Sequence, residues 1–384
     1  MKRLIPLFLF LFLFLLLLPV FTGCQTHKPA DGSSWVLGPF EKDLRDNPVL
    51  GPLTNVSFPD PIRKSDVYWE AKDVFNPASV VRGDTLFLLF RAEDSIGRYN
   101  GTSRIGLAYS LDGVHFTRED HPVLYPDHDA FFKYEWEGGC EDPRIVEDDS
   151  GTYYMTYTAY NGDKARLFIA TSRDLRHWTK HGSVFARAGE QYVDMWSKSG
   201  SIVSEMREGR LIAVKIHGKY RMFWGESSIY MATSDDLIHW DPVLETDPAK
   251  MQYDTMRHYT AAFKILFTTR RGKFDSELVE PGPPALLTEH GIVFIYNSKN
   301  SPAYGDTSLP AGTYAAGQVL IDKDNPEKVI DRTDRWFIAP DQPFEITGQV
   351  NNVCFVEGLS FFHGKWFLYY GTADSRIAVA TAKQ

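Results

Sequence analysis

The chain has 384 residues, with 41 Lys and Arg against 50 Asp and Glu, which gives a formal net charge of −9 at pH 7. Such an acidic protein has no basic excess to neutralise phosphates, so nucleic acid and anionic membrane surfaces are not expected as partners. The three cysteines show no CxxC or His-rich spacing. The sequence therefore indicates no zinc or other metal site, and it calls for no cofactor.

The N-terminus predicts export. Lys2 and Arg3 precede an apolar run over residues 4–21, and Thr22-Gly23-Cys24 follows. This pattern is typical of a lipoprotein signal peptide over residues 1–23 with Cys24 as the lipid attachment site. An uncleaved membrane anchor is the alternative. Both place the bulk of the protein outside the cytoplasm, and the lipoprotein signal predicts a cell-envelope protein with an outer-membrane lipid anchor, facing the periplasm or the surface. Residues 24–66 lack periodicity and are interpreted as a tether followed by a strap that packs on the fold.

A pattern with a period of about sixty residues begins after the strap. Ala108, Ala170 and Ala232 are spaced by 62 residues, and each is followed at the same offsets by Ser, Asp, His and an aromatic residue. A fixed period of this size on short alternating strands is typical of propeller blades. The sequence therefore predicts an all-β, five-bladed β-propeller over residues 67–384.

Three histidines of the repeat and two cysteines outside it have a structural interpretation. The Asp of each copy can bond the backbone of the turn that follows it, so the repeated His115, His177 and His239 are predicted as turn residues and not as catalytic or metal-binding groups. Cys140 and Cys354 each stand at the beginning of a different inner-strand candidate. Free buried thiols are therefore favoured over a disulfide.

Polar residues stand where the candidate inner strands begin. The segment 138–146 places Asp142 at the start of an apolar strand, where burial is expected to raise the pKa of the carboxyl so that it donates a proton near neutral pH. The alternative is a turn ended by Pro143, with Arg144 as a salt-bridge partner. Inner strands of a propeller converge, so one polar ligand site is expected from a ring of five residues: Asn76, Asp142, Lys198, Glu280 and Glu357.

Several motifs in this order resemble glycoside hydrolase family 130, propeller enzymes that phosphorolyse or hydrolyse β-mannosides. The motifs are Phe75-Asn76-Pro77-Ala78, Leu89-Phe90-Arg91-Ala92, Glu141-Asp142-Pro143-Arg144 and Tyr369-Tyr370-Gly371-Thr372-Ala373-Asp374. The resemblance implies that Asp142 is the catalytic acid and that Asn76, Arg91 and Asp374 hold the mannose. An Arg91–Asp374 pair that closes the ring is the alternative. Glu141, Arg144 and Lys198 are further substrate-binding candidates.

The chain departs from the phosphorylase pattern where that pattern gathers cations. Leu287 stands where a Lys is expected, Asn297 where a His is expected, and Gly225-Glu226 where an Arg is expected. Phosphate needs cations around it, whereas water needs a carboxylate to take its proton. The resemblance therefore implies the hydrolytic branch, an inverting β-mannosidase with Glu226 or Glu280 as the base.

Two other functions stay open at this point. Phosphorolysis that releases mannose 1-phosphate would rely on Lys198, Arg144 and Lys215 to hold phosphate. A non-catalytic sugar-binding propeller would use the many Trp and Tyr residues as stacking surfaces. Among substrates, the resemblance favours β-1,2-mannooligosaccharides and then β-1,4-mannooligosaccharides, and the sequence assigns no oligomeric state.

Overall fold

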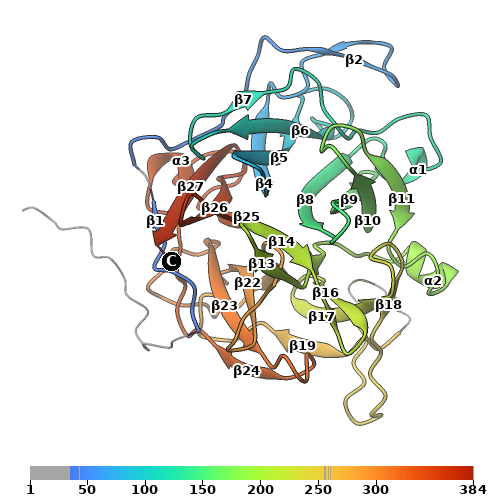
Figure 1. The fold of residues 1–384 in the computed structure, drawn as a ribbon, viewed down its shortest axis with the longest axis vertical. Coiled ribbons are helices and arrows are strands. Elements are labelled where there is room, and N and C mark those ends of the chain that lie inside the picture. The colour runs from blue at the N-terminus through green and yellow to red at the C-terminus, as the bar shows by residue number, and fades with distance from the viewer. Residues whose placement is uncertain (1–34, 43, 255–256, 258, 260, 384) are drawn as a thin grey trace, which may run out of the picture.

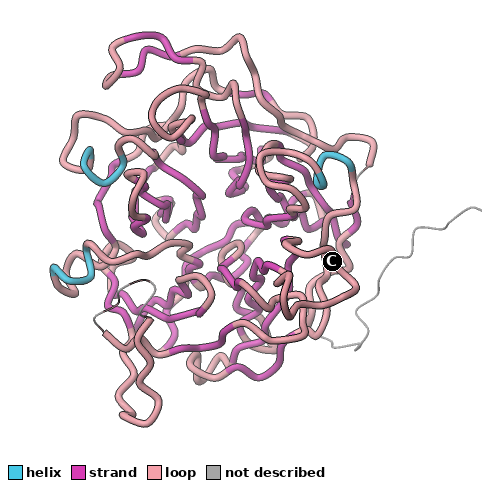
Figure 2. Tube along the Cα trace, turned by 180° about the vertical axis from the view of Figure 1, so that it is seen from behind, coloured by secondary structure: helices cyan, strands magenta, loops and turns pink. Residues whose placement is uncertain are grey.

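The structure, a computed structural model, describes residues 35–42, 44–254, 257, 259 and 261–383. Within these ranges the regular secondary structure is almost entirely β-strand, and the helices are three single turns: α1 (Phe132–Glu135), α2 (Glu190–Val193) and α3 (Pro343–Ile346). Figure 2 shows these helices toward the outside of the strands. The prediction of an all-β fold is confirmed.

The predicted signal peptide and Cys24 lie outside the described residues. In the part of the chain that the structure does describe, no helix combines the length and the apolar character needed to cross a bilayer. The segment interpreted as a strap is described from Trp35 onward. Trp35 is buried, and its Nε1 donates a hydrogen bond to Asp331 Oδ2 at 3.0 Å.

Most of the described strands pair in five antiparallel groups that follow one another along the chain (Figure 1). The first two are β4 (Asp73–Arg82), β5 (Thr85–Glu93), β6 (Ser103–Ser110) and β7 (Thr117–Arg118), then β8 (Gly139–Glu147), β9 (Tyr153–Tyr160), β10 (Ala165–Ser172) and β11 (Thr179–Ser183). The third is β12 (Ser201–Ile202), β16 (Lys219–Trp224), β17 (Ser228–Ser234) and β18 (Trp240–Pro242). The last two are β21 (Leu286–Leu287), β22 (Ile292–Lys299), β23 (Tyr314–Ile321) and β24 (Val329–Arg332), then β25 (Cys354–Phe362), β26 (Lys365–Thr372), β27 (Arg376–Lys383) and β1 (Glu41–Lys42).

Shorter strands extend or connect these groups. The hairpin of β13 (Ser204–Arg207) and β14 (Arg210–Ala213) joins its neighbours, because β14 pairs with β8 and β13 pairs with β21. The remaining short strands are β15 (Lys215–Ile216) and β19 (Ile265–Thr268) in the third group, β20 (Leu278–Pro281) beside β22, and the hairpin of β2 (Phe58–Asp60) and β3 (Ser65–Val67).

The hairpin β2–β3 is fixed to the first group by a buried arginine. Arg104 of β6 is fully buried, and its Nη2 and Nη1 lie 2.6 Å from Asp60 Oδ2 and 2.7 Å from Asp94 Oδ2. The two carboxylates accept directional, charge-assisted hydrogen bonds from the guanidinium and offset the cost of burying its charge. Part of the predicted strap therefore lies against the fold through a specific contact.

The apolar core is divided among the interfaces between successive groups. In the described residues, one cluster joins Leu89 of the first group to Phe168 of the second, and further clusters join the second to the third, the third to the fourth and the fourth to the fifth. Another cluster joins Leu88 of the first group to Phe367 of the fifth. Burial of apolar surface therefore holds each group to the next, and the last to the first.

The repeated Ser, Asp and His residues build the same turn in three groups. Asp112 Oδ1 accepts a hydrogen bond from the His115 backbone N–H, and His115 Nδ1 lies 2.8 Å from Asp112 Oδ2. The same ring contact recurs at 2.7 Å and 2.8 Å in the pairs His177–Asp174 and His239–Asp236. The prediction that these histidines are structural turn residues is confirmed.

A buried cluster fixes α1 to the second group. Glu135 of α1 accepts a hydrogen bond from Tyr157 Oη at 2.8 Å and pairs with Lys180 Nζ of β11 at 2.5 Å. Both Glu135 and the neighbouring thiol of Cys140 are fully buried. The lysine therefore supplies the positive charge that a buried carboxylate needs.

The fifth group contains a cluster of the same composition. Glu345 of α3 accepts a hydrogen bond from Tyr370 Oη at 2.9 Å and pairs with Lys42 Nζ at 2.7 Å, beside the thiol of Cys354. Lys42 belongs to β1, so β1 occupies in the fifth group the place that β11 occupies in the second. The two thiols are free and buried, as the sequence predicted.

Candidate active site

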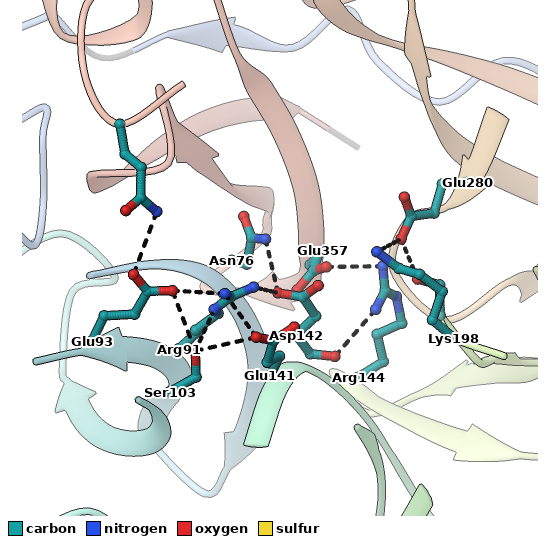
Figure 3. A network of polar contacts seen from close by, with 12 residues as sticks. Asn76, Arg91, Glu93, Ser103, Glu141, Asp142, Arg144, Lys198, Glu280 and Glu357 are labelled. Carbon is teal, nitrogen blue, oxygen red and sulfur yellow. Dashed lines mark hydrogen bonds and ion pairs between the residues drawn. The ribbon is translucent and has the colours of Figure 1, made fainter. Parts of the chain in front are cut away.

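Irregularities in three inner strands turn polar side chains toward one region. The register of β4 shifts at Asn76, that of β8 at Asp142 and that of β25 at Glu357. Asn76 and Asp142 adopt left-handed backbone conformations, with φ of 47° and 50°. A bulge re-aims the side chain of the residue that does not pair. Figure 3 shows the three side chains close together in one polar network.

Arg91 of β5 gathers three carboxylates on one side of this network (Figure 3). Its Nη1 lies 3.2 Å from Asp142 Oδ1, and its Nη2 lies 2.9 Å from Glu141 Oε1 and 2.6 Å from Glu93 Oε1. Asn76 Nδ2 donates a further hydrogen bond to Asp142 Oδ1 at 3.0 Å. Lys72 Nζ lies 2.8 Å from Glu93 Oε2 and adds a second cation, but two positive charges do not balance three ionised carboxylates, so this cluster favours retention of a proton.

Glu141 and Asp142 are neighbours in sequence but differ in pKa. For Asp142, burial acts to raise the pKa, but Arg91, Lys198 and the Asn76 hydrogen bond together lower it to about 2. For Glu141, burial and the charges of Asp142 and Glu93 outweigh Arg91 and raise the pKa to about 7. The expectation that burial raises the pKa of Asp142 is therefore wrong, because nearby cations outweigh desolvation. The pair still holds one proton up to near neutral pH, mainly on Glu141.

Asp374 lies in the turn between β26 and β27, with a left-handed φ of 49°. Burial raises its pKa to about 7, although Arg91 acts in the opposite direction. Among the contacts of the described residues, the ion pairs of Arg91 are with Glu93, Glu141 and Asp142. The alternative of an Arg91–Asp374 pair is therefore not what the structure contains, and the Asp374 carboxyl stays available to a ligand.

Lys198 forms the other side of the network with two glutamates. Its Nζ lies 3.0 Å from Glu280 Oε1 and 3.8 Å from Glu226 Oε2. Ser199 Oγ also donates a hydrogen bond to Glu280, and Arg257 Nη2 lies 2.8 Å from Glu226 Oε1. These contacts bring both candidate bases to the same cation. They also leave Lys198 with its charge already balanced.

The two glutamates have different environments. Glu280 has a side chain that is 3% exposed, and burial raises its pKa although Lys198 acts in the opposite direction. Glu226 has a side chain that is 17% exposed, and Lys198 and Arg257 overcome the effect of burial and lower its pKa. Glu226 is therefore ionised at neutral pH and is the more accessible of the two to water.

Arg144 lies between the two sides of the network (Figure 3). Its guanidinium donates hydrogen bonds to the backbone carbonyls of Gly282, Pro281 and Asp142 at 2.8, 2.7 and 3.2 Å. Its Nη2 also lies 2.8 Å from Glu357 Oε1. The sequence predicted Arg144 as a substrate contact or as a salt-bridge partner within a turn. In the structure, Arg144 is 2% exposed, and the ion pair of Asp142 is with Arg91.

The structure therefore brings most of the predicted site residues into one network, which contains Asn76, Arg91, Glu141, Asp142, Arg144, Lys198, Glu226 and Glu280. Asp374 interacts electrostatically with Arg91 and Asp142. Cys24 lies outside the described residues. Sequence reasoning missed Glu93. Side chains alternate between the two faces of a strand, so Glu93 lies on the same face as Arg91, which precedes it by two residues. Sequence reasoning also missed Gln349, whose Nε2 donates to Glu93 Oε2 at 3.4 Å.

Asn297 and Leu287, which stand where cations are expected in phosphorylases, both contact other parts of the protein. Asn297 is fully buried, and its side chain donates to the carbonyl of Val356 at 2.9 Å and accepts from the Val356 N–H at 2.7 Å. Leu287 is half-buried beside an apolar cluster at β21. Lys215, a candidate phosphate ligand, is exposed and lies over the ring of Tyr220 at 4.9 Å.

Comparison with known proteins gives the family. Residues 47–384 match the family described as β-1,4-mannooligosaccharide phosphorylase, glycoside hydrolase family 130. The chain is 31% identical over 350 residues to a 1,2-β-oligomannan phosphorylase from Thermoanaerobacter sp. strain X514, which covers 88% of this chain and 96% of that relative.

Solved structures are similar over nearly the whole chain. A putative glycoside hydrolase from Bacteroides ovatus ATCC 8483 is 46% identical with a TM-score of 0.84, over 92% of this chain and 98% of that one. Another solved structure is 44% identical with a TM-score of 0.85, over 92% of this chain and 98% of that one. It is described as part of work on family 130 glycoside hydrolases that target β-1,2 mannosidic linkages in Candida mannan. With the family match over most of its length, the chain belongs to glycoside hydrolase family 130.

Proposed function

We propose that the protein is an inverting β-mannosidase that releases mannose from β-mannooligosaccharides, with β-1,2 linkages favoured over β-1,4. The observation that carries this proposal is the balanced charge of Lys198, which Glu280 and Glu226 already neutralise. An attacking phosphate needs unpaired cations, and this side of the network offers carboxylates instead. Water, in contrast, needs a carboxylate to accept its proton.

In the proposed reaction, Asp142 assists departure of the leaving sugar, and a glutamate on the opposite side activates water. The proton that the Glu141–Asp142 pair retains is the source for the leaving group, and it passes to the leaving oxygen through Asp142. Glu226 is the proposed base, because it is ionised and more accessible than Glu280. Glu280, bonded to Ser199 and Lys198, holds the cation in place. Asn76, Arg91 and Asp374 are the proposed contacts of the mannose hydroxyls.

The choice of linkage is supported by the 44% identity between this chain and the solved structure from the work on hydrolases that target β-1,2 linkages. Phosphorolysis is the second candidate, because the 31% identical relative is a phosphorylase. A non-catalytic sugar-binding role is a weaker alternative, since such a role would not require paired carboxyls with separated pKa values.

One incubation distinguishes the three functions. Purified protein is mixed with β-1,2-mannobiose or β-1,4-mannobiose, with and without phosphate, and the products are followed by NMR. The expected product is free mannose, first as the α-anomer, at a rate that phosphate does not raise. Mannose 1-phosphate formed in proportion to phosphate would establish the phosphorylase. Binding without turnover would establish the lectin-like role.

The same proposal includes the five-bladed propeller. Its support is the succession of five antiparallel groups, the apolar clusters between neighbours and the cluster that joins the last group to the first. Ala108, Ala170 and Ala232 lie on β6, β10 and β17, the third strands of their groups. An experimental structure should superpose these alanines by rotation about a single axis, and failure to do so would refute the repeat.

The lipid anchor at Cys24 is also part of the proposal, and it rests on the signal pattern of residues 1–23. Cells that express the full chain and are fed an alkyne-labelled fatty acid should label the wild type in the outer-membrane fraction. Cys24→Ala should be unlabelled. Equal labelling of both proteins would refute lipid attachment at this residue.

A further inference from the structure

Arg144 is a buried arginine whose donors are directed at protein atoms. Nε donates to Gly282 O at 2.8 Å, Nη2 to Pro281 O at 2.7 Å and Nη1 to Asp142 O at 3.2 Å. At 2% exposure, the side chain is closed to solvent. A guanidinium is planar and rigid, so bonds from three of its nitrogens fix the relative positions of the acceptors.

The acceptors belong to the segment of the proposed acid, Asp142, and to the segment of Glu280, which pairs with Lys198 beside the proposed base Glu226. One is the carbonyl of Asp142, and the other two directly follow Glu280 in the chain. The Arg144 side chain therefore spans the space between β8 and β20. An inverting glycosidase holds its acid and base about 6.5–9.5 Å apart to leave room for water. A rigid connection between the Asp142 backbone and the Glu280 segment keeps such a separation through Lys198, which contacts both Glu280 and the proposed base Glu226.

Glu357 faces Arg144 from a third strand. It is fully buried, and Arg144 Nη2 lies 2.8 Å from its Oε1, although neither carboxyl oxygen accepts a well-directed hydrogen bond from the described residues. The charged groups that interact with it are Arg144, Asp142, Glu280 and Lys198. The Asn297 side chain forms two hydrogen bonds with the backbone of the neighbouring Val356, and so fixes the bulge that carries Glu357.

We propose that Arg144 is a positioning residue that holds the Asp142 backbone and the Glu280–Gly282 segment at a fixed separation, and that Glu357 keeps Arg144 in place. This inference rests on the proposed reaction for its kinetic meaning. It assigns Arg144 to the geometry of the site and not to contact with the sugar. Loss of the connection should therefore reduce turnover while substrate binding is preserved.

The first test replaces the planar guanidinium group of Arg144 but keeps its positive charge. Arg144→Lys should lower kcat about a hundredfold, because a misplacement of about 1 Å costs that much, with KM within threefold of wild type. Arg104→Lys is the matched control, since Arg104 is as deeply buried and pairs with Asp60 and Asp94 in the first group. The control should lower the melting temperature to a similar extent while it keeps at least half of kcat.

A second pair of variants keeps the proposal falsifiable if Arg144→Lys does not fold. Glu357→Met removes the acceptor that faces Arg144, and Glu357→Gln retains an oxygen of the same size and place. The expected result is a tenfold or greater loss of kcat in Glu357→Met and recovery to within threefold of wild type in Glu357→Gln. Equal kcat in wild type and Glu357→Met would overturn the role given to Glu357.

Other outcomes separate this inference from the proposed function. A tenfold rise in KM at unchanged kcat in Arg144→Lys would make Arg144 a sugar contact and overturn the inference. Unchanged kcat and KM would do the same. The product formed by the wild type decides between hydrolysis and phosphorolysis independently, because the variants are compared with the wild type in whichever reaction it catalyses.

Discussion

Lys198 Nζ lies 3.0 Å from Glu280 Oε1, and the two groups come from different strand groups on the side of the network opposite Arg91. Burial acts to lower the pKa of Lys198, but Glu280 and Glu226 overcome it and raise the pKa. The ammonium therefore stays charged at any physiological pH. Its role in the proposed reaction is to orient the carboxylates of Glu226 and Glu280.

Glu226→Gln should lower hydrolysis at least a hundredfold, because a positioned base contributes about a hundredfold to ten-thousandfold. Azide, a nucleophile that needs no base, should restore turnover and yield α-mannosyl azide. Glu277→Gln is the control, since Glu277 is also paired with a lysine, 2.8 Å from Lys299 Nζ. Azide rescue of Glu280→Gln but not of Glu226→Gln would reverse the assignment.

Asp142→Asn should lower the hydrolysis of mannobiose by a similar factor, because the Glu141–Asp142 pair loses the carboxyl through which its proton reaches the leaving oxygen. Asparagine tolerates the left-handed φ of 50° at this position, so the backbone should be preserved. A dinitrophenyl β-mannoside, whose leaving group needs no proton, should be cleaved by the variant at close to the wild-type rate. If the variant retains more than a tenth of wild-type turnover on mannobiose, Asp142 is not the acid.

The raised pKa of Glu141 predicts a pH dependence of stability. Between its ordinary value of 4.5 and about 7, the unfolded state is ionised while the folded state keeps the proton, so the free energy of unfolding should fall as pH rises through this window. Glu141→Gln should remove that part of the slope. Denaturant unfolding of both proteins at pH 4.5, 6 and 8 measures it, and an unchanged slope in the variant would contradict the assignment.

The two lysine clusters predict matched losses of stability. Lys42→Met and Lys180→Met each leave a fully buried carboxyl, Glu345 or Glu135, without its cation. Each should lower the free energy of unfolding by about 3–5 kcal/mol. Lys219→Met, which breaks an exposed pair with Asp235, should cost about 0–1 kcal/mol. Losses below about 1 kcal/mol in the buried pairs would show that these clusters are not stabilising.

The repeat and the polar starts of the inner strands were predictable because both are local patterns. The Ser-x-Asp turn bonds its own backbone within five residues, so its spacing survives in the sequence. The pKa of Asp142 was not predictable, because it depends on Arg91, 51 residues away, and on a bulge that aims Asp142 at it. The proposed role of Arg144 was not predictable from the sequence either. Its hydrogen bonds go to backbone carbonyls, which every residue has, so no residue type marks the acceptors.

The family match begins at residue 47, whereas β1 ends at Lys42. A shortened protein that starts at the family boundary would lack Glu41 and Lys42 and would expose the backbone groups of their β27 partners, Thr381 and Ala380, at the edge of that sheet. Open edges of this kind invite pairing with other chains. Aggregation of such a protein would therefore report the loss of β1 and of the Lys42–Glu345 pair and not a defective catalytic site, and restoring residues 35–46 should return it to solution.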